Sequence, residues 1–409
     1  METVRAAFAD RARPLLSYGI PFPAAVAHHV RETFHAARVY VICSGSLARS
    51  TDVLDRLRQA LGQNTLVGVR VGMQSHTLWS EVLEIVHDVR RVDADLLVTV
   101  GGGSLTDGAK VIALALANSV STTSDLSTLS EGPDQRADIH APRIPIVSVP
   151  TSLSAGEYSN FAGATDDASR RKHSFQSPLK GPELVVLDPQ LTVTTPERIW
   201  LSSGVRAVDH CVETYVAVSS STNEKTDALA LHALGLLVPS LLRCKHDPQD
   251  LEARLMAQLG SVDAMAACTS GKAVQLGASH GIGHQLGPLG VAHGETSCIL
   301  LPAVCKYNAT HNANNERQDR LRRFLVDDPT VAESLKNHGV DGQRADLADV
   351  LDVVIRELGM PRSLKAVGVG PDQLDALAAN SLHDRWCQTN PVPLKEKEQV
   401  LDILNLVVA

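Results

Sequence analysis

The sequence predicts an α/β N-terminal domain followed by an all-helical C-terminal domain. In the first half, short continuous apolar runs alternate with amphipathic segments, which is typical of a parallel sheet covered by helices on both faces. After Pro196, strand-like runs nearly vanish and helical periodicity continues to the end of the chain. Aromatic residues make up only 3% of the 409 residues, so the core must consist of Ala, Val, Leu and Ile, which suits this architecture.

The elements of the first half follow from the apolar pattern. The predicted strands are 38–43, 65–71, 95–100, 144–149 and 183–187, and the predicted helices are 52–61, 76–89 and 105–116. Residues 118–143 are rich in Ser, Thr and Asp and contain two prolines, so we expect a long surface loop.

The second half is predicted to be helical over 205–218, 226–242, 250–267, 331–337, 347–358 and 371–379. Pro189 and Pro196 punctuate the connection between the two halves. We therefore expect an α/β domain of residues 1–192 and a helical domain of residues 193–409.

Composition excludes several classes of protein. Thirty-eight basic and 46 acidic residues give a net charge of −8, which argues against a nucleic-acid binder. The seven cysteines are odd in number and form no CxxC pair, which favours a reducing compartment over a disulfide framework. No stretch reaches the roughly 18 consecutive apolar residues that a membrane helix needs, and residues 1–16 show no secretory signal. We expect a cytoplasmic protein.

A glycine run marks a candidate phosphate site. Gly101, Gly102, Gly103 and Ser104 stand where a predicted strand ends and a helix begins. Glycines let the backbone approach an anion, and the helix N-terminus offers unpaired N–H groups. A tight turn without a ligand would show the same pattern. Asp107 is either a structural residue of this helix or a partner for a ribose.

Histidines cluster in a second region. His280 and His284 stand at i and i+4 on one face of a predicted helix, and His293 follows a turn that contains Gly and Pro. His210 lies in another helical segment. A lone helical histidine is more often structural, but four of them in this setting could bind a transition metal or relay protons.

Five ordered motifs carry a family resemblance. They are GGGSLTDGAK, PTSLSAGE at 150–157, LVVLDPQL at 184–191, GVRAVDHCVE at 204–213 and GASHGIGHQLG…AHGETSCILLP at 277–302. In order and spacing they resemble the iron-containing (group III) alcohol dehydrogenase superfamily. The resemblance implies a dehydroquinate synthase-like fold, with a dinucleotide-binding N-terminal domain and a helical C-terminal domain. It also implies a nicotinamide cofactor and, as the habit of the family, a homodimer.

The resemblance places the metal-ligand positions of the family on Arg206, His210, His280 and His293. Arginine stands where the family has aspartate, and a guanidinium offers no lone pair to a metal. Asp209 points about 60° away from that position on a helix. The metal-independent maleylacetate reductase branch also replaces the aspartate and keeps the histidines, so we expect no metal. If iron or zinc is bound, its ligands are His210, His280 and His293, with Asp209 as the alternative to the missing aspartate.

The same resemblance implies the residues that hold NADPH or NADH. Ser44 occupies the place after the first strand where an aspartate often selects NAD, so NADPH is permitted. Lys172 matches a lysine near the cofactor, although its basic run also fits a solvated hairpin. The full predicted set is Ser44, Gly101, Gly102, Gly103, Ser104, Asp107, Thr151, Ser152, Ser154 and Lys172.

These expectations combine into one functional hypothesis. The chain is predicted to be an NAD(P)H-dependent oxidoreductase that reduces a carbonyl or an activated C=C bond of a small substrate, without a metal. Arg206 favours a carboxylate substrate and, with His210, His280 and His293, would stabilise developing negative charge. His284 would donate the proton. The alternatives are a metal-dependent alcohol dehydrogenase and a lyase or cyclase related to dehydroquinate synthase.

Overall fold

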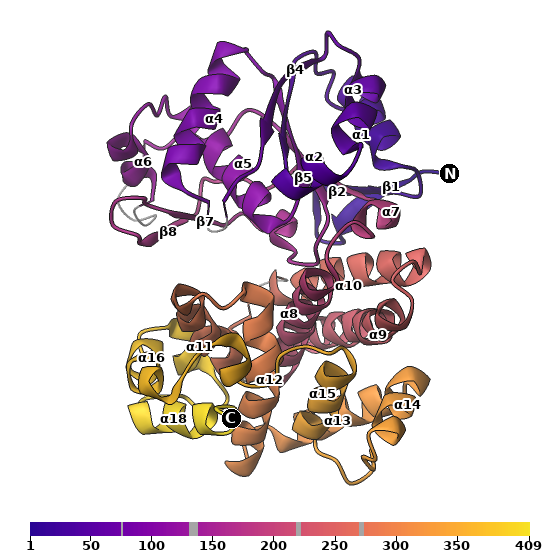
Figure 1. Cartoon of the computed structure of the whole chain (residues 1–409), viewed down its shortest axis with the longest axis vertical. Helices are drawn as coiled ribbons and strands as arrows, with labels where there is room; N and C mark the ends of the chain where they lie inside the picture. Colours follow the sequence, from indigo (N-terminus) through magenta and orange to yellow (C-terminus); the bar gives the residue numbers. More distant parts are fainter. Residues whose placement is uncertain (75–76, 131–137, 218–221, 270–273) are drawn as a thin grey trace. The chain divides into compact units, whose positions relative to one another are not determined.

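The structure is a computed structural model that describes residues 1–74, 77–130, 138–217, 222–269 and 274–409. Its contacts divide the chain into two compact units, Met1–Thr194 and Thr195–Ala409. Figure 1 shows the strands in the first unit and helices throughout the second. His76 and Val218, at the ends of two predicted helices, lie outside the described residues.

The first unit is built on a seven-stranded sheet within the described residues, in the order β1-β2-β9-β6-β5-β3-β4. The hairpin β1–β2 is antiparallel, and every other neighbouring pair is parallel. The predicted parallel sheet is therefore confirmed, with an antiparallel edge added. The strands are β1 (Thr3–Phe8), β2 (Arg11–Tyr18), β3 (Val39–Cys43), β4 (Leu66–Val71), β5 (Leu96–Gly101), β6 (Ile146–Pro150) and β9 (Leu184–Leu187).

Helices cover both faces of this sheet, as predicted. Tyr40 and Ile42 of β3 face a core shared with α4 and α5, whereas Val39 and Val41 face a core shared with α1 and α3. This alternation is the side-chain period of a strand that is buried on both sides. The helices of the unit are α1 (Phe22–Glu32), α2 (Gly45–Ser50), α3 (Val53–Leu61), α4 (Trp79–Arg91), α5 (Gly103–Ala117), α6 (Thr123–Leu129) and α7 (Pro189–Thr192).

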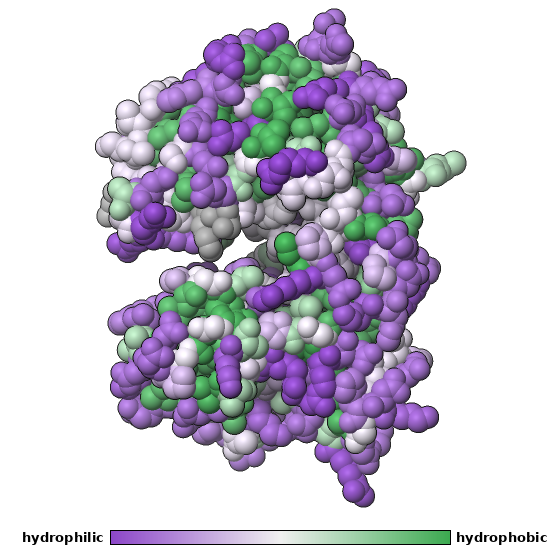
Figure 2. All heavy atoms as spheres, in the orientation of Figure 1, coloured by the Kyte–Doolittle hydropathy of each residue, from purple (hydrophilic) through white to green (hydrophobic). Residues whose placement is uncertain are grey.

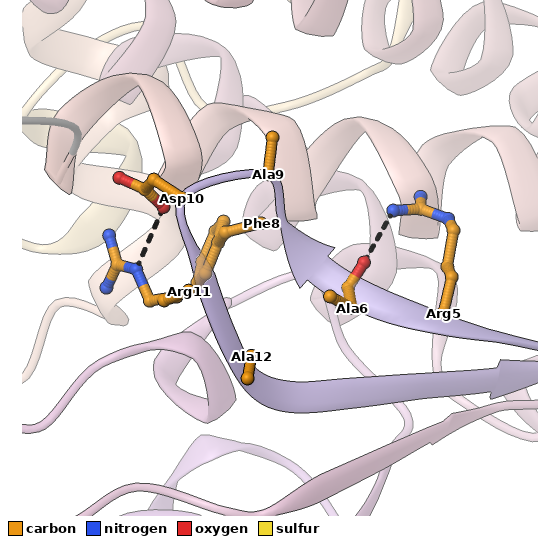
Figure 3. A pocket seen from close by; sticks show the side chains of 7 residues that line it. All are labelled: Arg5, Ala6, Phe8, Ala9, Asp10, Arg11 and Ala12. Atoms are coloured by element: carbon orange, nitrogen blue, oxygen red, sulfur yellow. Dashed lines mark hydrogen bonds and ion pairs between the residues drawn. The ribbon is translucent and has the colours of Figure 1, made fainter.

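The N-terminal hairpin is a feature that the sequence pattern does not predict. Residues Thr3–Phe8 form an edge strand whose first half is exposed, so no continuous apolar run announces it. At its tip the Arg11 guanidinium lies 4.4 Å from the centre of the Phe8 ring and 3.3 Å from Asp10. Figure 3 shows these side chains around a shallow pocket in the hairpin.

The predicted loop over 118–143 is wrong for residues Thr123–Leu129, which form α6. Thr122 and Asp125 make a reciprocal capping box that satisfies the N-terminal N–H groups of the helix, and Leu126 and Leu129 are buried. The Ser/Thr-rich composition hid this short helix. Residues 131–137 lie outside the described residues.

The second unit contains only helices and turns among its described residues, as predicted. Helix α8 begins at Glu197, well before the predicted start, because Pro196 at its N-cap is compatible with a helix start. Pro302 lies inside α12, which explains why the pattern does not predict that helix. The α-helices are α8 (Glu197–Val216), α9 (Glu224–His246), α10 (Leu251–Thr269), α11 (Ala278–Leu286), α12 (His293–Thr310), α13 (Asn315–Val326), α14 (Pro329–Asn337), α15 (Leu347–Glu357), α16 (Leu374–Ser381), α17 (Arg385–Thr389) and α18 (Lys397–Asn405).

One helix in the described part of the chain, α9, is long and apolar enough to span a membrane by length and composition alone. Half of its most apolar window is buried inside the structure, which is also the property of a core helix in a soluble protein. On the face in Figure 2, hydrophilic residues predominate and hydrophobic ones appear in smaller groups on both units.

Candidate active site

The glycine run forms a backbone cradle at the end of β5. Gly101 ends the strand with φ +152°, and Gly102 is the N-cap of α5, whose first turn has no side-chain cap. A Cβ on Gly103 would stand 2.7 Å from the Ser154 hydroxyl oxygen, so a larger residue there would displace that hydroxyl. The uncapped helix N-terminus therefore leaves N–H groups for an anion, as the sequence predicts.

Neighbouring strands bring the predicted cofactor residues to this cradle. Ser44 follows β3 and Thr151 follows β6, and both strands flank β5. The Thr151 N–H donates to the Gly101 carbonyl at 3.0 Å, and a Cβ on Gly101 would stand 2.9 Å from that of Ser44. The Ser152 hydroxyl oxygen lies 3.8 Å from where a Cβ on Gly102 would stand, and that of Ser154 lies 2.7 Å from where a Cβ on Gly103 would stand. The carboxyl edge of three adjacent parallel strands is where such sheets bind ligands.

Two other predicted cofactor residues lie elsewhere in the same unit. Asp107 accepts from the Lys110 ammonium at 3.3 Å and from the Gly163 N–H at 3.3 Å. Lys110 is fully buried and also donates to the Gly156 and Phe161 carbonyls. It therefore links α5 to the segment between β6 and β7. Lys172 is exposed on β8 (Lys172–Phe175), which pairs with β7 (Ala162–Thr165) in a hairpin. Its aliphatic chain occupies the space beside Gly163.

In the second unit, α8, α11 and α12 bring the four predicted histidines together. The ring centroids of His210 and His280 are 4.6 Å apart, those of His280 and His284 are 6.5 Å apart, and those of His284 and His293 are 6.3 Å apart. His280 is buried, whereas His284 and His293 are exposed. The row of rings therefore runs from the interior of the unit to its surface.

Glycines allow the three helices to approach this closely. A Cβ on Gly294 would stand 2.6 Å from the Ser202 backbone of α8, and a Cβ on Gly281 would stand 2.6 Å from the Cys387 sulfur of α17. Gly283 faces Thr296 at 3.0 Å in the same way. The glycine-rich character of the histidine segment is thus a packing requirement.

Arg206 is buried inside the cluster and is held by polar groups of α8 and α12. Its Nη1 donates to the Ser297 hydroxyl at 3.0 Å and lies 3.8 Å from Asp209 Oδ2. Asp209 Oδ2 in turn accepts from the Ser297 and Ser279 hydroxyls at 2.5 and 2.8 Å. The chain therefore carries a buried cation and its counter-charge one turn apart on the same helix.

Glu213 is a member of the cluster that the sequence analysis missed. Its carboxylate accepts from the Gly277 and Ser279 N–H groups at 2.9 and 2.8 Å, at the N-terminus of α11, and from His280 Nδ1 at 2.8 Å. The available signal was its spacing, four residues after Asp209 on one helix. Burial raises the pKa of Asp209 to about 8 and that of Glu213 to about 7.

The contact with Glu213 fixes the state of His280. Because a carboxylate accepts, Nδ1 carries the hydrogen and Nε2 holds a lone pair. Nε2 and His210 Nδ1 are both buried without a hydrogen-bond partner, and burial lowers the pKa of both imidazoles. In this tautomer Nε2 is an acceptor, and the part of His280 in stabilising negative charge stays a prediction.

The family resemblance implies iron, which needs ligand atoms with free lone pairs. His280 Nε2 is buried with a free lone pair, as a metal ligand needs. The family resemblance places Arg206 at the fourth ligand position, and its guanidinium offers no lone pair and donates to Ser297. Asp209, Glu213 and His280 place ligand atoms within 4.8 Å of one another, and Asp209 Oδ1 and His280 Nε2 are buried without a hydrogen-bond partner. The donor set of this chain therefore differs from that implied for the family at Arg206.

Known proteins match the chain over both units. Residues 20–189 match the model of iron-containing alcohol dehydrogenase, and residues 200–408 match that of the Fe-containing alcohol dehydrogenase family, C-terminal. Dehydrogenase FUM7 of Gibberella moniliformis is 39% identical over 96% of this chain and 95% of its own length. The chain belongs to the iron-containing alcohol dehydrogenase family, and it is an oxidoreductase.

Two further relatives bear on this assignment. The 4-hydroxybutyrate dehydrogenase of Cupriavidus necator is 30% identical over 86% of each chain. The crystal structure of maleylacetate reductase from Agrobacterium tumefaciens has a TM-score of 0.74 and 23% identity, and the match covers 100% of this chain and 97% of that chain. The latter similarity confirms the fold, with an α/β first domain and a helical second domain.

Proposed function

We propose that the chain is an NADPH- or NADH-dependent reductase that works without a metal ion and acts on a carbonyl or activated C=C bond of a small carboxylate. The observation that carries this proposal is the buried guanidinium of Arg206 near His210 and His280, where the family resemblance implies a metal ligand. A fixed organic cation can stabilise developing negative charge as a metal ion would.

The cofactor proposal depends on the cradle in the first unit. The uncapped N-terminus of α5, with Gly101–Gly103 beneath Ser152 and Ser154, suits a pyrophosphate. The bound nicotinamide would supply the hydride. β3 ends at Cys43, and neither Cys43 nor the following Ser44 supplies a carboxylate. The Arg49 guanidinium lies beside Gly45, 3.0 Å from where a Cβ on that glycine would stand. This arrangement favours NADPH, because a cation beside the ribose accommodates a 2′-phosphate.

Cofactor preference can be tested directly with Arg49→Ala. We expect kcat/KM with NADPH to fall about tenfold and kcat/KM with NADH to change little, since only NADPH carries the 2′-phosphate. Arg58→Ala, at an exposed arginine of α3 paired with Asp55, is the matched control. An unchanged NADPH/NADH ratio in Arg49→Ala would remove Arg49 from the cofactor site.

The substrate proposal depends on the charge of the histidine cluster. Burial raises the pKa of Asp209 and Glu213 and keeps His210 and His280 neutral. Near pH 7 the two carboxyl groups are partly protonated, so the positive charge of Arg206 is not fully balanced. A substrate carboxylate or enolate would complete the balance. The name of the 4-hydroxybutyrate dehydrogenase relative, whose substrate bears a carboxylate, agrees with this proposal.

The proton is proposed to come from His284, the histidine of α11 that reaches the surface. As a carbonyl carbon accepts hydride, its oxygen becomes negative and takes a proton from the imidazolium. The His293 ring lies parallel to that of His284. His293 and Arg206 would stabilise the negative charge that develops on this oxygen.

The test uses a matched pair of aldehydes, 4-oxobutanoate and butanal, with protein that has been dialysed against a chelator and analysed for metals. We expect oxidation of NADPH with 4-oxobutanoate in the absence of iron and zinc. Arg206→Met should raise KM for 4-oxobutanoate far more than KM for butanal. Arg254→Met, at a buried arginine of α10 that lies over Trp200, controls for the loss of a buried cation. Activity that requires added metal, or equal effects on both aldehydes, would overturn the proposal.

The remaining parts of the proposal concern the setting of the enzyme. All seven cysteines are free and buried, which suits the cytosol. The partner is a small molecule, and neither nucleic acid nor membrane is expected from the charge and composition. A homodimer stays a prediction from the family, and size-exclusion chromatography with light scattering would test it.

A further inference from the structure

A carboxylate from a distant part of the chain contacts the proposed proton donor. Asp384 Oδ2 lies 2.8 Å from His284 Nδ1, although the two residues are 100 positions apart. The Asp384 side chain is 14% exposed and that of His284 is 37% exposed. Because a carboxylate only accepts, Nδ1 must carry the hydrogen and Nε2 is the atom left to exchange a proton.

The second oxygen of Asp384 has a different partner. Oδ1 accepts from the Trp386 N–H at 2.9 Å and caps the short helix α17. The two carboxylate oxygens are therefore divided between a backbone cap and the imidazole. Only a carboxylate can make both contacts and carry a negative charge, so Asp and the longer Glu are the two residue types that could stand here.

The segment that carries Asp384 is fixed against α11 along its length. The Thr389 hydroxyl donates to the Leu276 carbonyl at 2.6 Å, and the Asn390 amide oxygen accepts from the Ala278 N–H at 3.2 Å. Between these contacts and the Asp384–His284 pair, Cys387 lies so close to Gly281 that a Cβ on Gly281 would stand 2.8 Å from the Cys387 backbone nitrogen. Gly281 and His284 share one face of α11, so this packing sets the position of Asp384 relative to the imidazole.

We infer that Asp384 is a positioning residue that holds His284 in the Nδ1–H tautomer and so presents Nε2 to the substrate oxygen. This inference rests on the proposed function. In the reduction, a hydride adds to the carbonyl carbon, the C=O π electrons move to the oxygen, and the N–H bond at Nε2 breaks as the O–H bond forms. The Asp384 carboxylate accepts from Nδ1 throughout the transfer, and the partly exposed ring regains its proton at Nε2 from water.

Three substitutions separate the two contacts of Asp384. Asn and Ser are good N-caps, whereas Ala is not. Asn has one acceptor oxygen, so it can cap α17 or accept from His284, but not both. We expect Asp384→Asn and Asp384→Ser to keep a melting temperature close to that of the wild type and to lose at least about tenfold in kcat, with little change in KM. Asp384→Ala should lose both stability and kcat.

Matched controls come from another helix cap. Asp328 caps α14 through the Thr330 and Val331 N–H groups and has no histidine partner in the structure. Asp328→Asn and Asp328→Ser should leave kcat unchanged. If Asp384→Asn and Asp384→Ser keep the wild-type kcat and only Asp384→Ala is impaired, Asp384 is a helix cap alone and the inference is wrong.

A spectroscopic readout separates this inference from the proposed function. The ring ¹⁵N shifts of labelled histidine, assigned with His284→Gln, report the tautomer of neutral His284 without any turnover. We expect the Nδ1–H form in the wild type and a mixture, with the usual Nε2–H form, in Asp384→Ser. A wild-type protein that oxidises no reduced cofactor with the aldehydes would overturn the proposed function, whereas an Nε2–H tautomer in the wild type would overturn the positioning role.

Discussion

Removing the charge of Arg206 should destabilise the second unit, and the structure gives the size of the effect. Arg206→Met keeps most of the side-chain volume but leaves Asp209, which is fully buried, without the cation at 3.8 Å. Breaking one partner of a buried pair costs about 3–5 kcal/mol. The Ser279 and Ser297 hydroxyls still donate to Asp209, so we expect the lower part of this range.

The pH dependence of the stability penalty shows whether the Arg206–Asp209 ion pair is its cause. Burial raises the pKa of Asp209 to about 8, so its carboxyl is mostly ionised at pH 9 and mostly protonated at pH 6. A carboxyl whose folded pKa lies above its unfolded value loses stability as pH rises between the two values. Without Arg206 the folded pKa rises further, so the penalty of Arg206→Met should be larger at pH 9 than at pH 6.

A double-mutant cycle measured by urea unfolding completes the test. Asp209→Asn removes the carboxylate, so the double variant Arg206→Met/Asp209→Asn should be more stable than the sum of the single effects by about 1–3 kcal/mol. Arg254→Met serves as the control background, because Arg254 lies on another helix, α10, and donates to the Pro248 carbonyl in the turn before that helix. Additive energies, or a penalty that does not depend on pH, would refute the buried ion pair.

Two further predictions concern the cradle and the buried histidine. Gly103→Ala should weaken NADPH binding at least about tenfold by fluorescence titration, because its Cβ would meet Ser154 Oγ at 2.7 Å; Gly287→Ala, where no atom lies within 4 Å, should bind normally, and equal affinities would exclude the cradle. His280→Asn keeps a donor for Glu213 but removes an imidazole whose pKa burial lowers. A depressed pKa means that stability is lost as pH falls below the unfolded value near 6.5, so the wild type should lose up to about 1.4 kcal/mol more than the variant between pH 7.5 and 5.5. Parallel curves of stability against pH for the wild type and His280→Asn would contradict the prediction of a buried, neutral His280.

The local pattern of the chain determined most of the fold. Short apolar runs such as 96–100 predict strands buried on both faces, and the helical period after Pro196 predicts the second unit. The pattern could not predict β1, whose first half is exposed, or α6, whose capping box lies in a Ser/Thr-rich stretch. These elements depend on edge pairing and on a cap, which leave little periodic signal.

The sequence also determined the residue types of the candidate site, because Gly101–Ser104 and the four histidines form local motifs. Only the tertiary structure decided their partners. Asp384 lies 100 positions from His284, and the Ser297 hydroxyl that bridges Arg206 and Asp209 comes from another helix. Hydrogen bonds and ion pairs act over a few ångströms in space whatever the separation along the chain, so protonation states and charge balance could be assigned only once the helices were packed.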